Sequence, residues 1–402
     1  MKIFLSLCLM LAVNAQAGKL LIVGGALAAN NSDVYEGFIN ALPSKSSRIA
    51  IFPVASSKPW KTATKFKQDL VRFGANKNNI EIFPLAVIDD SSTKVDESNW
   101  KDNANNEALV EQLKDVDGFW FTGGDQMRII NTLSKDPTKP SLLLDLLHKK
   151  LKKGALIGGS SAGAAMMSDT MIAAGDSFSA LTSDVSSKYF GMETQEQGKL
   201  YLHHGLGFFP FGIVDQHFDR KARLGRLAKT LSMNSTKLGY AVDENTAMLV
   251  DIDKQTLAVL GAGTVTILDG RASKAQGLAL NDFNVSVLSA NSEFDLNGQI
   301  LLHGAGDETI AHEYMNETPW QGAGFALPNA RLDHILGYEL LDNKAAKEIR
   351  RYSFSEQGDG FVYRFVQTQD SLGYWKTNGT LDQYTVLNVT MHIEPVKITI
   401  SK

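Results

Sequence analysis

The chain has 402 residues, a length that favours two domains over one compact core. Its composition, with 44% apolar and 21% charged residues, is that of a globular protein, and its net charge of −4 excludes a general basic surface for nucleic acid. The only cysteine, Cys8, lies near the start, so the rest of the sequence offers no disulfides, thiolate catalysis or cysteine metal sites.

The first 17 residues have the pattern of a cleavable secretory signal. Lys2 precedes an apolar run over 3–13, and an A-x-A stretch then fits cleavage after Ala17. The run is shorter than the roughly 20 residues that a membrane-spanning helix needs. We therefore expect a secreted or periplasmic protein with no membrane attachment after cleavage. A buried first strand is the weaker alternative, because a better strand begins at Lys19.

From Lys19 to about Asp269, short apolar strands alternate with helical stretches. Two of the expected helices end at Gly74 and Gly154, where a left-handed residue often terminates a helix. Such apolar strands indicate a parallel sheet covered on both faces, with ligands at the carboxyl ends of the strands. The expected strands lie at 19–25, 48–56, 80–87, 118–124 and 155–161.

Beyond about Arg271 the pattern changes to alternating runs, which predict strands at 361–368, 384–393 and 396–400. One helix is expected near 343–352. We predict a signal peptide over 1–17, a catalytic α/β domain over 18–272 and a β-rich C-terminal extension over 273–402.

A G-x-S-x-G motif runs from Gly159 to Gly163, directly after the expected strand at 155–161. In a nucleophile elbow, small residues on both sides of the serine allow a sharp turn from strand to helix. Ser161 would then be the nucleophile, and the N–H of Ala162 would point toward a developing oxyanion. A plain strand-to-helix turn is the alternative reading. A phosphate loop is excluded, since no G-x-x-x-x-G-K-[ST] sequence occurs.

A serine nucleophile needs a base, and His217 is the best placed of the eight histidines. It follows an apolar stretch that resembles a strand, and in the helix after it Arg223 and Arg226 share one face. A capping histidine beside a solvated basic helix is equally compatible with the sequence. The pair at 203–204 lacks the spacing of a metal site, and no metal is expected.

A second glycine pair, Gly123–Gly124, follows the expected strand at 118–124. The N–H of Gly124 is the candidate for a second oxyanion donor. Asp125 and Gln126 open the next helix, and Asp125 can cap it at the same time.

Four motifs together resemble the cyanophycinases, members of the serine peptidase family that also contains dipeptidase E. The motifs are FTGGDQ at 121–126, GGSSAGAAMMSDTMI at 158–172, DQHFDRKARLGRL at 215–227 and GYAVDENTAMLV at 239–250. The resemblance spans roughly 19–294. It implies a three-layer, mostly parallel sheet like those of class I glutamine amidotransferases and flavodoxin, with Ser161 as nucleophile and His217 as base.

The resemblance also implies a substrate pocket and a substrate, and it implies no cofactor. The family substrate is cyanophycin, a polyaspartate that carries arginine on each side chain, and the product is chiefly the β-aspartyl-arginine dipeptide. Arginines can bind carboxylates in bidentate fashion, whereas aspartate and glutamine oxygens can receive a guanidinium. The residues that match the family's pocket are Gln126, Asp215, Gln216, Arg223 and Arg226. A homodimer stays open.

Two departures from the family pattern concern the pocket and the acid of the triad. Lys221 stands where the family has an arginine, and lysine cannot make the bidentate contact. The resemblance implies a glutamate shortly after the nucleophile, but that spacing falls on Ser179. Asp176, at the spacing of dipeptidase E, is the preferred acid, and Asp184 and Glu193 are the alternatives.

Three functions follow from these patterns. The first is a secreted hydrolase of the polymer, and the second is a peptidase acting on short peptides that contain aspartate. The third is an inactive binding homologue that has lost its acid. The segment over 176–204, which is longer than is usual in the family, could act as a lid or as a rim.

Overall fold

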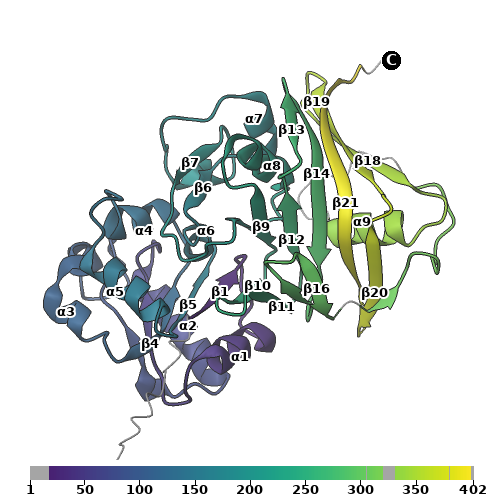
Figure 1. Ribbon diagram of the computed structural model, residues 1–402. Helices are drawn as coiled ribbons and strands as arrows, with labels where there is room; N and C mark the ends of the chain where they lie inside the picture. The colour runs from purple at the N-terminus through teal and green to yellow at the C-terminus, as the bar shows by residue number, and fades with distance from the viewer. Residues whose placement is uncertain (1–17, 305, 320–330, 380, 400–402) are drawn as a thin grey trace, which may run out of the picture.

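The computed structural model describes residues 18–304, 306–319, 331–379 and 381–399 (Figure 1). The predicted signal peptide lies outside these ranges. Two large sheets of nine and ten strands and a small two-stranded antiparallel sheet, β6 (Thr170–Ala174) with β7 (Tyr201–His204), make up the β-structure of the described residues. Among the described residues no helix is both long and apolar enough to cross a membrane.

One half of the nine-stranded sheet is parallel, in the order β1-β5-β4-β2-β3. Successive residues of β1 belong to two different cores: Leu20 and Ile22 to one, Leu21 and Val23 to the other. Helices therefore cover both faces, which gives three layers (Figure 1). The strands are β1 (Lys19–Val23), β2 (Arg48–Phe52), β3 (Ile80–Ile82), β4 (Val116–Phe121) and β5 (Leu156–Ser160).

The helices on the two faces divide according to these two cores. The core that holds Leu21 includes residues of α1 (Ser32–Ala41) and α2 (Pro59–Arg72). The core that holds Leu20 includes residues of the helices on the other face, which are α3 (Glu107–Glu111), α4 (Gln126–Leu133), α5 (Leu142–Leu151) and α6 (Ala162–Ala165). The predicted left-handed residues beyond α2 and α5 are confirmed, with φ of 101° at Gly74 and 95° at Gly154.

The other half of the same sheet is antiparallel, so the prediction of a mostly parallel sheet holds for only part of it. β10 pairs with β1, and the order then continues through β11 and β15 to β16. Short turns connect β10 to β11, which places the two strands antiparallel. These strands are β10 (Thr246–Asp251), β11 (Thr256–Gly261), β15 (Glu293–Asp295) and β16 (Ile300–His303).

The ten-stranded sheet combines strands from the middle and the end of the chain. Its main path is β17-β20-β21-β14-β12-β9-β8, in which only β8 and β9 are parallel. β13 pairs with β14, and β19 pairs with both β18 and β21. The strands are β8 (Ile213–Gln216), β9 (Leu238–Val242), β12 (Val265–Asp269), β13 (Lys274–Gln276), β14 (Ala279–Leu288), β17 (Asp307–Glu308), β18 (Glu348–Phe354), β19 (Asp359–Val366), β20 (Leu372–Asn378) and β21 (Leu381–Lys397).

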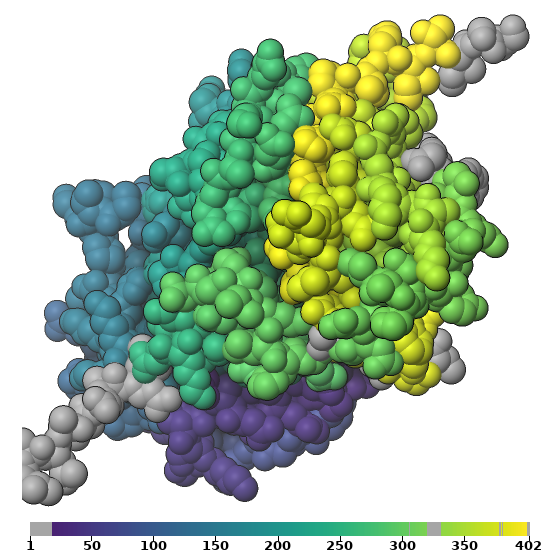
Figure 2. Space-filling model, turned by 45° about the vertical axis from the view of Figure 1, so that its right-hand side comes forward, coloured from purple at the N-terminus to yellow at the C-terminus, as the bar shows by residue number. Residues whose placement is uncertain are grey.

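The C-terminal region is strand-rich, as predicted, and it continues the sheet that contains β8 and β9. The predicted domain boundary at 272/273 falls between β12 and β14, which pair from Val265–Leu288 to Asp269–Asn284. One core joins these strands to three helices, α7 (Ser177–Thr182), α8 (Leu224–Met233) and α9 (Leu332–Leu336). In Figure 2 the yellow C-terminal strands lie directly against the green and teal part of the molecule.

The predicted helix near 343–352 is wrong. The stretch from Glu348 onward forms β18, paired with β19, and the helical turns lie earlier, in α9 and in a π-helical turn at Gly337–Leu341. Ile349 and Arg351 are buried, whereas Arg350 between them is exposed. This two-residue period is that of a strand.

Candidate active site

Ser161 occupies a sharp turn between β5 and α6. Its φ of 55° and ψ of −108° are unusual for a residue other than glycine. The turn requires small neighbours: a Cβ on Gly159 would lie 2.3 Å from the carbonyl oxygen of Gly163, and one on Gly163 would lie 2.4 Å from that of Phe121. The local geometry is therefore that of the predicted nucleophile elbow.

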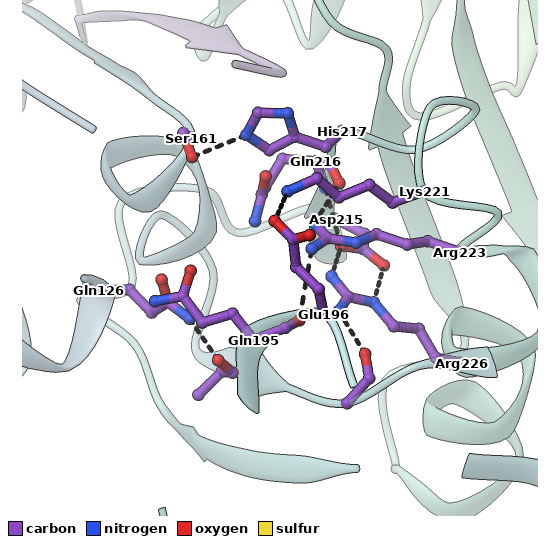
Figure 3. Close-up of polar contacts among 12 residues, drawn as sticks. Gln126, Ser161, Gln195, Glu196, Asp215, Gln216, His217, Lys221, Arg223 and Arg226 are labelled. Atoms are coloured by element: carbon purple, nitrogen blue, oxygen red, sulfur yellow. Dashed lines mark hydrogen bonds and ion pairs between the residues drawn. The ribbon is translucent and has the colours of Figure 1, made fainter. Parts of the chain in front are cut away.

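Three side chains form a hydrogen-bonded line at this turn. The Ser161 Oγ lies 2.9 Å from Nε2 of His217, and Nδ1 of His217 lies 2.6 Å from Oε1 of Glu244 (Figure 3 shows the serine–histidine contact). A carboxylate at Nδ1 holds the proton there, which leaves Nε2 free to accept the hydroxyl proton. The arrangement can therefore activate the serine for nucleophilic attack.

The fold brings this line together from both sheets. Ser161 follows β5 of the first sheet, and His217 follows β8 of the second. Glu244 lies in the connection from β9 to β10, where the chain crosses between the sheets. Since β8 and β9 are parallel neighbours, the residues just beyond them lie at the same sheet edge.

The prediction that Asp176 is the acid of the triad is wrong, because its carboxylate is bound elsewhere. Its carboxylate caps α7, accepting from the N–H and the hydroxyl of Ser179, both at 2.8 Å, and from the N–H of Gly198 at 2.7 Å. The alternatives Asp184 and Glu193 are exposed. Glu244 could have been found in the sequence, because it follows the apolar strand 238–242 in the same way that His217 follows 213–216.

The Gly24–Gly25 turn after β1 supports both His217 and the Glu244 loop. The carbonyl of Gly24 accepts from the N–H of His217 at 2.7 Å, and that of Gly25 accepts from the N–H of Asn245 at 2.8 Å. Gly25 has a φ of 113°, and a Cβ there would lie 2.2 Å from Cε1 of His217. A role for this glycine pair was not predicted from the sequence.

The two predicted oxyanion donors are the backbone N–H groups of Ala162 and Gly124. Among the described residues neither Ala162 nor Gly124 donates its N–H to a hydrogen bond. Gly124 has a φ of 143°, and a Cβ on the adjacent Gly123 would lie 3.3 Å from Cβ of Ser161, so the second glycine turn packs against the serine. Asp125 caps α4 as predicted, accepting from the N–H of Met127 at 2.8 Å.

A cluster of cations lies beside His217, and its members are largely engaged. Arg226 and Asp215 form a bidentate pair, with Nε 2.9 Å from Oδ2, and both side chains are 1% exposed. Arg223 donates to the carbonyl of Gln216 at 2.6 Å and is also buried. Lys221 pairs with Glu196, a residue that the sequence analysis did not single out. Breaking a buried pair such as Arg226–Asp215 costs about 3–5 kcal/mol.

The two predicted pocket glutamines carry buried acceptors without a partner. Gln126 donates through Nε2 to the carbonyl of Ala173, but its Oε1 has no hydrogen-bond partner among the described residues. The Oε1 of Gln216 is likewise unpartnered, and the two residues are 2% and 4% exposed. Buried polar atoms are normally paired, so these oxygens favour a ligand that brings N–H donors.

His203 and His204 each contact a backbone carbonyl through a ring nitrogen. Nε2 of His204 lies 2.7 Å from the carbonyl oxygen of Ser134, and Nδ1 of His203 lies 3.1 Å from the carbonyl oxygen of His204. No group of three histidine, cysteine or acidic residues arranged to hold a metal occurs within the described ranges.

The comparison with known families now bears on this geometry. The model of peptidase family S51 matches residues 20–258, more than half of the chain. The chain belongs to peptidase family S51. The resemblance noted in the sequence agrees with this membership.

Curated relatives of this S51 peptidase are named cyanophycinases. The one from Synechococcus elongatus is 35% identical over 182 residues, which are 45% of this chain and 51% of that protein. A Nostoc relative is 27% identical over 293 residues, 70% of this chain and 87% of that protein. One from Geminocystis herdmanii is 30% identical over 256 residues, 63% and 81% of the two chains. The chain spans about half the length of the Synechococcus relative it matches.

The S51 peptidase should not tolerate a side chain at Gly25. Gly25→Ala would direct a methyl group into the imidazole of His217 and displace it from Ser161, and a shift of about 1 Å can lower the rate about 100-fold. Gly74→Ala is the matched control, because its φ of 101° is equally strained but nothing lies within 4 Å of the new Cβ. We expect kcat/KM to fall only for Gly25→Ala, while melting temperatures show that both variants fold. Equal activity of the two variants would contradict the role given to Gly25.

The pH profile of the S51 peptidase should extend into the acidic range. Burial, followed by the charges of Lys221, Arg223 and Arg226, lowers the pKa of His217 to about 3. The imidazole acts as a base only when neutral, which it is above its pKa, so a lowered pKa moves the acid limb of kcat/KM below the usual pH of about 6.5. Lys221→Met removes one of the charges and should shift that limb upward, whereas Lys229→Met, further along α8, should not. An acid limb at 6.5 in the parent protein would contradict this prediction.

Proposed function

We propose that the protein is a secreted serine exopeptidase that hydrolyses cyanophycin to β-aspartyl-arginine dipeptides through an acyl-enzyme. The observation that carries the proposal is the line from Ser161 through His217 to Glu244, at 2.9 and 2.6 Å, in the loops of an S51 peptidase. The curated relatives, which are named cyanophycinases, support the choice of polymer.

The proposed reaction proceeds in two steps. His217 takes the hydroxyl proton of Ser161 as the oxygen attacks a backbone carbonyl of the polymer, and the free N–H groups of Ala162 and Gly124 stabilise the oxyanion. The C–N bond then breaks, and the imidazolium gives its proton to the leaving amine. In the second step water, deprotonated by His217, hydrolyses the ester and restores the serine. Glu244 stabilises the imidazolium in both steps.

Substrate recognition would use the cluster beside His217. Lys221 and Arg223 would attract carboxylates, since two cations held close together favour an anionic group. The unpartnered oxygens of Gln126 and Gln216 would accept N–H groups of a guanidinium or an amide. A substrate carrying both aspartyl and arginyl groups offers both kinds of partner.

A peptidase acting on short aspartyl peptides is the second candidate. The observation that favours it is the segment over 191–198, whose contacts close the cation cluster from one side. Comparing kcat/KM on the polymer and on an aspartyl dipeptide separates the two candidates. The third candidate, an inactive binding homologue, rested on the missing acid of the triad. Because Glu244 lies at Nδ1 of His217, the lack of an acid no longer supports that candidate.

Secretion rests on the sequence of residues 1–17 alone. The proposal is tested by expressing the full chain in its host and determining the N-terminus of the protein found outside the cytoplasm. We expect a start at Gly18. A cytosolic protein that retains residues 1–17 would rule out secretion, although it would leave the peptidase activity untouched.

The direct test of the reaction is to incubate the purified protein with insoluble cyanophycin and to identify the soluble products by mass spectrometry. We expect β-aspartyl-arginine dipeptide as the main product. Release of free arginine alone, or no release at all while aspartyl dipeptides are cut, would reject the polymer proposal in favour of the second candidate.

A further inference from the structure

A short segment between two glycines lies over the cation cluster. It runs from Gly191 to Gly198, which have φ of 105° and 83°, and it contains a 3-10 turn at Met192–Gln195. Left-handed glycines are points at which a chain can bend freely. Its backbone is held at two neighbouring places: the carbonyl of Thr194 accepts from Gly175 at 3.1 Å, and Gly198 bonds with Asp176.

This segment presents two acceptors to the cluster. The carbonyl of Gln195 lies 3.4 Å from NH2 of Arg223 and 3.3 Å from NH1 of Arg226. The carboxylate of Glu196 pairs with Lys221, and in Figure 3 its side chain points from the segment toward that lysine. The segment thus contributes a carbonyl and a carboxylate, the two acceptor groups that a bound peptide would bring.

Glu196 is held less firmly than the two arginines of the cluster. Arg223 and Arg226 are 3% and 1% exposed and bond to fixed carbonyls and to Asp215. The Glu196 side chain is 56% exposed, and its only ion pair among the described residues is the one with Lys221. Glu196 is therefore the group of this cluster that a ligand can displace.

The charge balance of the cluster also favours an anion at the position of the Glu196 carboxylate. Three cations, Lys221, Arg223 and Arg226, face the carboxylates of Asp215, Glu196 and Glu244. Burial lowers the pKa of both Lys221 and Arg223, and the carboxylates of Glu196 and Glu244 offset part of that shift. Removing Glu196 leaves one positive charge without a partner in a partly buried site. An uncompensated buried charge is costly, so the vacated place favours a carboxylate.

We propose that Glu196 is a specificity-determining residue that occupies the place of a substrate carboxylate on Lys221, and that a ligand carboxylate reaches Lys221 only by displacing Glu196. A ligand that lacks a carboxylate leaves the Glu196–Lys221 pair in place, so Glu196 weakens the binding of carboxylate ligands alone. The choice of a peptide ligand rests on the proposed function, whereas the displacement itself rests on the contacts of Glu196, Gln195 and Lys221.

The test measures binding to the full chain carrying Ser161→Ala, so that no turnover occurs. Two probes are compared by calorimetry: the β-aspartyl-arginine dipeptide, and the same dipeptide with both carboxyls amidated. Glu196→Gln removes the competing charge and should tighten the dipeptide about fivefold, the equivalent of a partly exposed ion pair of about 1 kcal/mol. The diamide should bind both proteins with the same, weaker affinity.

Glu193→Gln is the matched control, because Glu193 lies in the same turn, is exposed, and has no ion pair among the described residues. It should leave both affinities unchanged. Lys221→Met should abolish the preference for the dipeptide over the diamide. This last result would distinguish displacement on Lys221 from a general opening of the segment.

Three outcomes overturn the inference. Weaker binding of the dipeptide to Glu196→Gln would mean that Glu196 recognises a cationic group of the ligand. If the Glu196→Gln and Glu193→Gln variants bind the dipeptide equally well, or if neither binds it measurably, Glu196 does not compete with the ligand. An equal gain for the diamide would show that charge is not the determinant. Absence of cyanophycin hydrolysis by the parent protein, by contrast, would reject the proposed function and leave these comparisons standing.

Discussion

Ser161→Ala is expected to lower kcat by about 10⁶, leaving the protein folded. The alanine keeps the elbow but removes the hydroxyl that lies against the imidazole, and loss of the nucleophile in other serine triads has about this effect. The residual rate would come from the oxyanion donors and from binding. The measurement is single-turnover and steady-state kinetics on cyanophycin, with circular dichroism to verify the fold.

Ser160→Ala is the control for this experiment, because Ser160 is the adjacent residue at the end of β5, whereas the hydrogen bond to His217 comes from Ser161. It should retain most of the activity. A fluorophosphonate should label the parent protein and Ser160→Ala, but not Ser161→Ala. Labelling that survives in Ser161→Ala would mean that another residue is the nucleophile.

Glu244→Gln is expected to lower kcat by about 10⁴. An amide in place of the carboxylate keeps the shape, but it no longer stabilises the imidazolium, and its NH₂ can donate to Nδ1 and select the wrong tautomer. The proton of His217 would then lie on Nε2, facing the hydroxyl that it should deprotonate. The kcat of the purified variant on the polymer measures this loss.

Asp176→Asn provides the comparison that decides between the two acids. Asparagine can still cap α7, but its NH₂ group replaces the oxygen that accepts from the N–H of Gly198, so the change should cost about 1 kcal/mol of stability and change kcat little. Denaturant unfolding measures the first effect and steady-state kinetics the second. A loss of 10⁴ in Asp176→Asn, with an active Glu244→Gln, would reverse the assignment.

The sequence led to Ser161 and His217 because each follows a recognisable apolar strand. Glu244 follows such a strand too, but it lies far along the chain from the nucleophile, whereas the family pattern predicts a glutamate close to it. Which strand ends meet depends on sheet order, and that order is a long-range property: β8 and β9 are separated in sequence by all of α8. Local patterns do not encode this pairing.

The division into two sheets, the strand β18 and the contact of Glu196 with Lys221 also depend on long-range pairing, which local sequence patterns do not show. The strands were largely predicted, but their division into two sheets follows from β9 pairing with β8 and β12 while the next strand, β10, pairs with β1. A helix was predicted at 343–352 because lysine and alanine favour helices. The pairing of β18 with β19 outweighs this local preference, so the stretch from Glu348 onward is a strand. The contact of Glu196 with Lys221 joins two loops and leaves no periodic signal.

The shared ten-stranded sheet has a consequence for protein engineering. The loops that carry His217 and Glu244 leave β8 and β9, and the hydrogen-bond ladder runs from these strands through β12 and β14 to β21 near the end of the chain. The imidazole and its carboxylate therefore owe their spacing to residues more than a hundred positions downstream. A chimaera with a related peptidase should take β8, β9, β12 and all later strands of this sheet from one parent, because a junction at 272 would force two unrelated edges to form a single ladder.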